Sequence, residues 1–153
     1  MRTHFLALAS LALMAAGCRD SGEPRPPSVK ELTAMLQSDD AKVQVEAAHW
    51  VIHEGPKAAA TTPALIMAMK SPDQMVRQSA ALALGHVGPE AVNAVPALIA
   101  GLDDPENSVR QAAAQSLGAL GPAASAAVPA LEKLAAQPDK CSAAPAALKK
   151  IRP

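Results

Sequence analysis

Four side chains in the first half of the chain could together hold a metal ion. His49 and His53 are four residues apart, so on a helix they would share one face, and Glu54 follows directly. His86 stands 33 residues after His53, an offset at which much of the chain repeats itself. Two histidines one turn apart and a carboxylate are a workable ligand set for a transition metal. The set lacks the further ligands of a complete site, so we predict no metal and keep these four residues as the candidate ligands.

A second set of polar side chains recurs at the same offset. Its carboxylates are Asp40, Asp73 and Glu106, and the residues four places after them are Gln44, Arg77 and Arg110. A row of this kind could bind an anion or a carboxylate. Charged pairs that recur in every repeat are more often part of the scaffold, so we interpret the row as structural.

The composition argues against several kinds of function. The sequence holds no Ser/His/Asp set, no glycine-rich phosphate loop and no Cys-x-x-Cys motif. Its 14 basic and 14 acidic residues cancel, so no electrostatic attraction favours nucleic acid or an anionic membrane. Trp50 is the only aromatic residue after Phe5, which argues against base stacking and an aromatic sugar platform. We therefore predict a protein that is not an enzyme, uses no cofactor and binds no nucleic acid.

These side chains belong to a sequence that repeats itself every 33 residues. The central copy, 71–103, has counterparts at 38–70 and 104–136. The central and following copies share Val-Arg-Gln, an alanine pair, Leu-Gly, Gly-Pro and Val-Pro-Ala-Leu in the same order. Such self-similarity is typical of a stacked array, in which no unit can bury its apolar face without its neighbours.

Each copy is expected to begin with an amphipathic helix. In the central copy, Ser71 is the expected N-cap, Pro72 the first helical residue and Gln74 the capping-box acceptor. Gly88 supplies a left-handed position that ends the helix, and Pro89 cannot continue it.

A second helix completes the unit, which is therefore a helical hairpin. Its start lies between Glu90 and Pro96, since proline is accommodated most easily in the first turn, and it ends near Leu102. The first helices carry alanine pairs that would let them approach closely. These pairs are Ala47-Ala48, Ala80-Ala81 and Ala113-Ala114.

The pattern that starts at Asp73 resembles a known repeat family. It reads Asp-x-x-Val-Arg-x-x-Ala-Ala-x-x-Leu-Gly-x-x-Gly-Pro up to Pro89 and continues with Val-Pro-Ala-Leu from Val95. This is similar to the HEAT repeat, in the short form of bacterial proteins and phycobilin-lyase-like arrays. Ankyrin repeats share the period, but their Thr-Pro-Leu-His signature is absent. The resemblance implies an all-α fold, a right-handed alpha solenoid in which matching Asp and Arg residues link neighbouring repeats.

The resemblance covers residues 28–153. We divide this HEAT-repeat domain into a half repeat 28–37, the repeats 38–70, 71–103 and 104–136, and a C-terminal capping half repeat 137–153. Ser28 and Glu31 form an expected capping box for the first helix. In the capping half repeat, the match to the preceding copy shifts to an offset of 31. There Lys149, Lys150 and Arg152 replace apolar or small residues, which suits a last helix that faces water.

Residues 1–17 resemble a lipoprotein signal peptide. Arg2 and His4 precede an apolar run, 5–14, that is too short to span a membrane, and small residues lead into Cys18. The resemblance to a lipobox implies cleavage before Cys18 and acylation of its thiol; an ordinary secretory signal is the alternative. Both interpretations export the protein. Residues 18–27 would form a flexible tether, and Arg19 would favour the periplasmic face of the outer membrane in a two-membrane cell.

Cys141 is the only thiol that remains once Cys18 is acylated. In an exported protein it could form an intermolecular disulfide, or pair with Cys18 if no lipid is attached. A single cysteine beside alanines is more often a small buried apolar residue, and we expect burial here.

The second helices offer the candidate partner surface. By analogy with HEAT arrays they would line a groove that accepts segments of other proteins. The residues after the shared leucines are Ile66-Met67, Ile99-Ala100 and Glu132-Lys133. We predict that Met67, Ala100 and Lys133 contact the partner; burial between repeats is the alternative for the isoleucines.

We therefore predict a non-catalytic protein-binding or scaffolding module at the cell envelope, anchored in the membrane through Cys18. The alternative is a metal-dependent or accessory enzyme of the HEAT-like hydroxylase or lyase type. Iron-dependent hydroxylases with HEAT repeats use several His-Glu dipeptides before the alanine pair, whereas this chain has only His53-Glu54, after it. A third possibility is an accessory subunit that caps a larger assembly.

Overall fold

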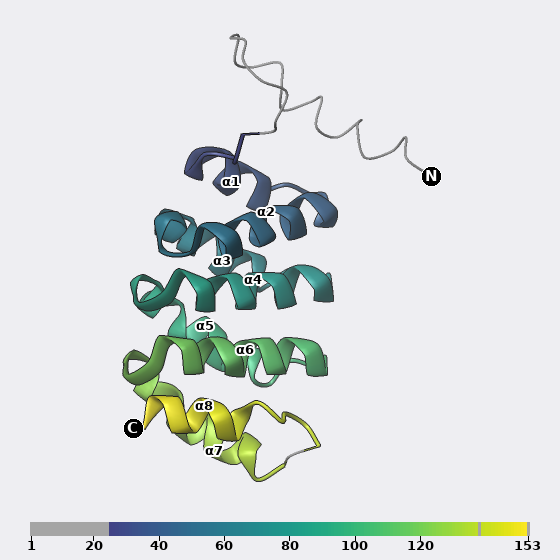
Figure 1. The fold of residues 1–153 in the computed structure, drawn as a ribbon. Coiled ribbons are helices and arrows are strands. Elements are labelled where there is room, and N and C mark those ends of the chain that lie inside the picture. Colours follow the sequence, from purple (N-terminus) through teal and green to yellow (C-terminus); the bar gives the residue numbers. More distant parts are fainter. Residues whose placement is uncertain (1–24, 138, 153) are drawn as a thin grey trace.

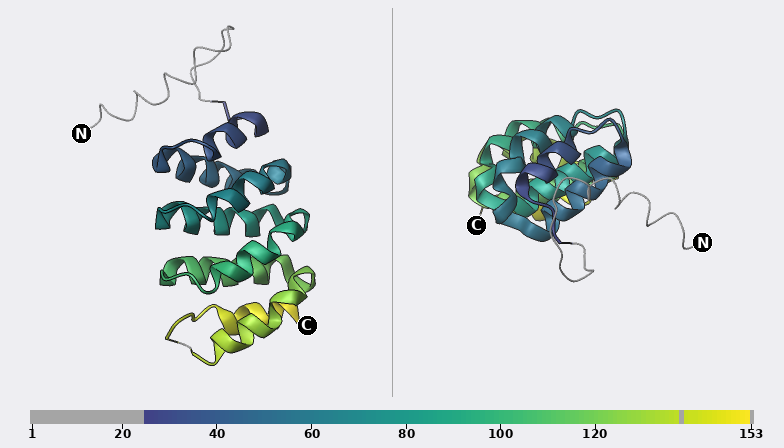
Figure 2. Two further views of the ribbon diagram at one scale, coloured as in Figure 1. Left: turned by 180° about the vertical axis from the view of Figure 1, so that it is seen from behind. Right: turned by 90° about the horizontal axis from the view of Figure 1, so that it is seen from above.

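The computed structural model describes residues 25–137 and 139–152, which form a stack of helices without β-strands (Figure 1). One layer contains α2 (Ala41–Glu54), α4 (Gln74–Val87), α6 (Asn107–Leu120) and α8 (Ala144–Ile151). The second layer contains α1 (Val29–Leu36), α3 (Thr62–Ala68), α5 (Val95–Gly101) and α7 (Val128–Ala135). Figure 2 shows the stack from behind and from above. The prediction of an all-α solenoid is confirmed.

Aspartates, rather than serines, cap the first-layer helices α2 and α4. In α4 the N-cap is Asp73, whose Oδ1 accepts hydrogen bonds from the main-chain N–H of Met75 and Val76 at 2.7 and 3.2 Å. The prediction that Ser71 caps this helix is wrong: its Oγ accepts from the N–H of Asp73 instead, at 3.2 Å. The carboxylate reaches two unpaired N–H groups and carries a charge that suits the positive helix end.

The expected capping box is present at the start of α1. The Oγ of Ser28 accepts from the N–H of Glu31 at 3.3 Å, and the carboxylate of Glu31 accepts from the N–H of Ser28 at 2.7 Å. The main-chain hydrogen bond from Ser28 and then the hydrogen bond from its hydroxyl lower the pKa of Glu31. Burial opposes them, and the charge of Arg25 adds to the lowering. This reciprocal pairing fixes the helix start.

Glycine ends the first-layer helices of the three full repeats. Gly55, Gly88 and Gly121 have φ of 57°, 80° and 60°. The positive φ was predicted, but the conformation is not the left-handed helical one: ψ at Gly88 is −151°, and essentially only glycine adopts this region. This turn leads into the 3₁₀ segments η2 (Gly55–Thr61), η3 (Gly88–Ala94) and η4 (Gly121–Ala127). In the central repeat the second helix then starts at Val95, within the predicted interval, and Pro96 lies in its first turn.

Small residues allow the first-layer helices to pack closely, as predicted. Both members of each alanine pair are buried, and α2 packs on α4, α4 on α6, and α6 on α8. α4 and α6 approach closely at Gly85 and Ser116, where a Cβ atom added at Gly85 would lie 2.6 Å from the Ser116 hydroxyl oxygen. That hydroxyl donates to the carbonyl of Ala81 at 2.7 Å. The contact therefore holds α6 directly against the backbone of α4.

Leucines from both layers form the continuous core between them. Leu65, Leu98 and Leu131 recur in the second layer and are fully buried. Leu84 and Leu117 meet them from the first layer and are also fully buried. Because one cluster joins these residues, each repeat completes its apolar face with the next.

Candidate partner-binding surface

The three predicted partner contacts are all exposed on the second layer. Met67 in α3 is 63% exposed, more than the other large exposed apolar side chains, Met75 and Val92, at 50% and 42%. Ala100 in α5 and Lys133 in α7 occupy the same register and are also exposed. We call these three residues the second-layer row. Its side chains are accessible to another molecule.

Ile66 and Ile99 lie beside the row, and their partial burial is closer to the alternative of packing between repeats than to an exposed contact. Ile66 and Ile99 are only partly exposed and pack against the core. The two isoleucines therefore support the exposed row from beneath, and Met67 provides most of its accessible apolar surface.

Exposed prolines flank the second-layer row at one helical turn. Pro63, Pro96 and Pro129 each lie four residues before a member of the row and are exposed in the first turn of their helices. Residues four apart share one face of a helix. At the α3 end the surface therefore presents the apolar side chains of Pro63 and Met67. At the α7 end it carries Lys133 and Glu132, whose carboxylate accepts from Arg152 at 2.6 Å.

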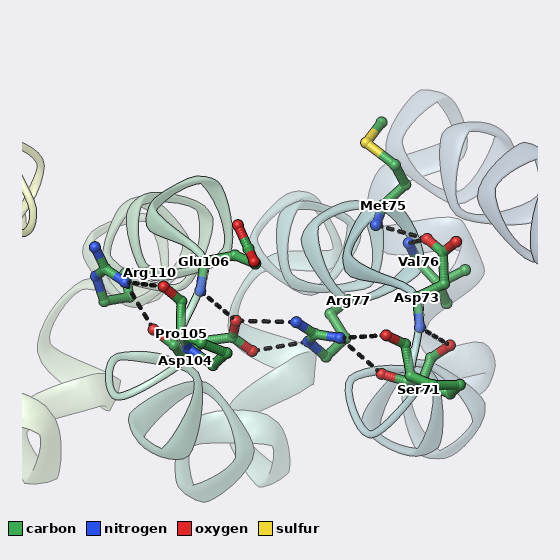
Figure 3. Close-up of polar contacts among 10 residues, drawn as sticks. Ser71, Asp73, Met75, Val76, Arg77, Asp104, Pro105, Glu106 and Arg110 are labelled. Carbon is green, nitrogen blue, oxygen red and sulfur yellow. Dashed lines mark hydrogen bonds and ion pairs between the residues drawn. The ribbon is translucent and has the colours of Figure 1, made fainter.

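Arg77, a member of the recurring charged set at the start of the first-layer helices, links two repeats by binding Asp104 (Figure 3). The 33-residue register had pointed to Asp73 instead. Nε and Nη2 of Arg77 donate to the two carboxylate oxygens of Asp104 at 2.8 and 3.1 Å. Nη1 of Arg77 donates to the carbonyls of Ser71 and Pro72 at 3.0 and 2.9 Å. The interpretation as an inter-repeat link is right. Asp73, the carboxylate in register, is a helix cap instead.

This pair is sheltered enough to affect its protonation. The Arg77 and Asp104 side chains are 14% and 11% exposed. Burial, the largest single influence, raises the pKa of Asp104, but hydrogen bonds from Arg77 and from the N–H of Glu106, with the nearby positive charges, outweigh it and lower that pKa overall. The hydrogen bond to Asp104 raises the pKa of Arg77. Both groups are therefore ionised and mutually satisfied.

The same position in the neighbouring repeats also binds main-chain carbonyls. Nη1 of Arg110 donates to the carbonyls of Asp104 and Pro105 at 2.8 and 2.7 Å, and its Nε donates to that of Lys140 at 3.0 Å. Gln44 donates to the carbonyl of Leu36 at 3.1 Å. This row is thus used to join the first-layer helices to the segments around them.

The candidate metal ligands do not form a compact site. His49, His53 and His86 are exposed, and Glu54 is partly exposed at the end of α2. Among residues 25–137 and 139–152, no group of three or more His, Cys, Asp or Glu side chains could hold a metal ion. His53 instead lies beside Trp50, with ring centroids 6.5 Å apart and planes tilted by 59°.

The predicted burial of Cys141 is confirmed. Within the described residues it forms no disulfide; the residue is 1% exposed, and its sulfur lies 3.8 Å from the carbonyl oxygen of Arg110. The signal peptide at 1–17, Cys18 and most of the tether at 18–27 lie outside the described residues. Within the described part of the chain, no helix has the length and apolar character needed to cross a membrane.

Comparisons with known proteins agree with this architecture. A family model described as HEAT repeats matches residues 29–93 and 62–149. A comparison with curated proteins found no match. One similar solved structure is the complex of CpcE and CpcF of phycocyanin lyase from Nostoc sp. PCC7120, at 35% identity and a TM-score of 0.64.

These similarities extend over most of the chain but not over the whole of the similar proteins. The alignment to the phycocyanin lyase structure covers 78% of this chain and 46% of that one. An engineered protein is 25% identical, with a TM-score of 0.64, and the alignment covers 80% of this chain and 60% of the engineered one. The chain thus spans about half the length of the first of these structures.

Proposed function

Because the chain belongs to the HEAT-repeat family, we propose that it is a non-catalytic module that binds or scaffolds another protein through its second-layer row. The observation that carries the proposal is Met67, a flexible apolar side chain that is 63% exposed on a rigid helix. Methionine adapts its shape to varied apolar partners. The similar phycocyanin lyase structure is itself a complex of two proteins, which supports a protein partner.

The surface also suggests how a partner would be oriented. Met67 and Pro63 offer apolar contacts at the α3 end, whereas Lys133 offers a positive charge at the α7 end. A partner segment with apolar side chains at one end and a carboxylate at the other would complement both. The row would then set the direction of the bound segment.

A crosslinking experiment in the native host tests this proposal. Benzoylphenylalanine is placed at Met67 and, as a matched control, at Met75, which is a methionine of similar exposure in the first layer. We expect one dominant protein adduct at position 67 that is absent at position 75. Ala100→Glu should abolish that adduct without changing the folded state, because it places a carboxylate in the middle of the row. Equal adducts at both methionines, or an adduct that persists with Ala100→Glu, would exclude the row as the binding surface.

We further propose that the module acts at the cell envelope, anchored by lipid at Cys18. The residues that support this are the short apolar run at 5–14 and the small residues before Cys18. Multiple acyl chains on one residue hold a protein firmly, whereas a single chain binds only marginally. Growth with an alkyne-labelled fatty acid tests the anchor: label should appear on the wild-type chain and disappear in Cys18→Ala. Labelling that is unchanged in Cys18→Ala, or absent from both, would rule out this site.

The similarity to phycocyanin lyase supports one alternative, an accessory role in an enzyme. Such a role would require the candidate ligands His49, His53, Glu54 and His86, which the proposed scaffold does not use. Replacing His53 and His86 by alanine separates the two. If the chain is a scaffold, this variant should support the same host function as the wild type and keep its crosslink at Met67, whereas an enzyme of this type should lose that function although the crosslink persists.

A further inference from the structure

The methionines in the described part of the chain differ sharply in their exposure to solvent. Met67 in α3 is 63% exposed and Met75 in α4 is 50% exposed. Met35 is only partly exposed and packs against the core, and Met69 is buried. Met67 and Met69 are two residues apart, so an exposed and a buried thioether follow each other closely along the chain. A small oxidant in water therefore reaches the sulfur of Met67 more readily than that of Met69.

Cys141, the one thiol in the described residues, is shielded from such an oxidant. A cysteine reacts as an exposed thiolate, whereas a buried structural cysteine is inert. Cys141 is buried, and its sulfur lies 3.8 Å from the carbonyl oxygen of Arg110. The most accessible sulfur atoms of the described residues are therefore the thioethers of Met67 and Met75.

A hydroperoxide converts an exposed thioether into a sulfoxide. The sulfur attacks one peroxide oxygen, an S–O bond forms and the O–O bond breaks. The proton on the transferred oxygen moves to the second oxygen, which leaves as water or as an alcohol. The sulfur loses two electrons and the peroxide gains them. The product is polar where the thioether was apolar, and methionine sulfoxide reductases restore the thioether.

At Met67 this change would alter the surface and spare the core. Met67 provides most of the accessible apolar surface of the second-layer row, which otherwise consists of the methyl group of Ala100 and the charged Lys133. Met69 is the methionine that packs between helices, since its Cε would lie 3.0 Å from a Cβ atom at Gly101. One added oxygen atom at Met67 therefore makes the apolar end of the row polar and leaves the packing of Met69 intact.

We propose that Met67 is a reversible oxidation site and that its sulfoxide releases the partner of the second-layer row. The oxidant is a hydroperoxide, and the reductant is a thiol used by a methionine sulfoxide reductase. The release rests on the proposed function, because it requires that the row bind a partner. Met75 lies in the first layer, outside the row, so its oxidation would leave partner binding unchanged.

Mass spectrometry of the folded chain treated with hydrogen peroxide tests the site itself. Met67 and Met69 share the tryptic peptide 58–70, and fragment spectra distinguish them. We expect Met67 to gain one oxygen roughly tenfold faster than Met69, and the two rates to become equal in denaturant. The far-ultraviolet circular dichroism of the oxidised chain should match that of the untreated chain. Equal rates in the folded chain, or unfolding on oxidation of Met67, would overturn the site.

Crosslinking from position 100 tests the release, because benzoylphenylalanine there leaves Met67 in place. The purified chain is oxidised, freed of peroxide and added to an extract of the host. Oxidation should weaken the partner adduct roughly tenfold, and treatment with a sulfoxide reductase and thiol should restore it. Met67→Leu keeps an apolar side chain of similar volume, so its adduct should persist after oxidation. Met75→Leu is the matched control and should lose its adduct on oxidation as the wild type does.

The outcomes separate this inference from the proposed function. An adduct that oxidation leaves at full strength, or one that oxidised Met67→Leu also loses, would overturn the release. If the untreated chain gives no adduct, the proposed function fails and the release fails with it. The oxidation site at Met67 is then decided by mass spectrometry alone.

Discussion

Replacing Gly85 by alanine should destabilise the protein although alanine is the better helix former. Gly85 lies inside α4, where the substitution alone would stabilise the helix by about 1 kcal/mol. The added Cβ would lie 2.6 Å from Oγ, 2.8 Å from Cα and 2.8 Å from Cβ of Ser116. One of these atoms belongs to the main chain of α6. The clash therefore cannot be relieved by a side-chain rotation alone, and α6 must move.

The expected size of the loss follows from these contacts. Overpacking a closely packed core costs about 1–3 kcal/mol. Displacing α6 also weakens the hydrogen bond from Ser116 to the Ala81 carbonyl, which contributes about 0.5–1.5 kcal/mol. After the gain in helix propensity is subtracted, we expect a net loss of about 0.5–3.5 kcal/mol in the free energy of unfolding. Urea titration followed by circular dichroism at 222 nm measures this loss.

A second variant identifies the cause of the destabilisation. Combining Gly85→Ala with Ser116→Gly removes the two side-chain contacts but leaves the 2.8 Å contact to Cα. The double-mutant cycle should therefore show a favourable coupling of about 0.5–2 kcal/mol, with incomplete recovery. If Gly85→Ala is neutral or stabilises the protein, helix propensity outweighs the contact. The close approach of α4 and α6 would then not limit the residue at this position.

Three other predictions concern stability and accessibility. Because the pKa of Asp104 is lowered on folding, the stabilisation that its carboxylate provides is complete above its unfolded pKa of about 3.9 and is lost as pH falls through the folded pKa. Urea titrations between pH 3 and 7 should therefore show that the free energy of unfolding falls less steeply toward low pH in Asp104→Asn than in the wild type. An equally steep fall in both proteins would contradict this. Gly88→Ala should destabilise the protein by about 1–3 kcal/mol because alanine is strained at φ 80° and ψ −151°. No steric clash adds to this, since a Cβ at Gly88 meets nothing within 4 Å. An unchanged melting temperature would show that the turn adjusts. The Cys141 thiol, 1% exposed, should react with Ellman's reagent only in denaturant, and rapid reaction of the folded chain would contradict its burial.

The repeat architecture could be predicted from the sequence because the 33-residue period, the glycine stops and the prolines all agree. Gly88 ends α4, and Pro96 lies in the first turn of α5, as the pattern indicated. The start of α4 could not be fixed, because Ser71 and Asp73 are both good caps and only the fold shows which side chain reaches the free N–H groups. The local sequence pattern thus predicts the presence of a helix reliably, but it does not fix the residue at which the helix begins.

The polar contacts between repeats were less predictable. The partner of Arg77 is Asp104, which takes the place of Ser71 in the next repeat and so looked like part of a turn. The exposure of Met67 followed from its register, since Leu65, two residues before it, and Ala68, directly after it, are buried.

The carbonyl contacts of Arg77 and Arg110 bear on how an array of this kind can lengthen in evolution. Each guanidinium binds the main-chain carbonyls of the residues six and five places before it. Every residue type supplies a carbonyl, so a duplicated unit would carry the main-chain acceptors for its own arginine. The carboxylate of Asp104, in contrast, strengthens one boundary only. Duplication can thus add units first, and single substitutions at the position of Asp104 can adjust each new boundary afterwards.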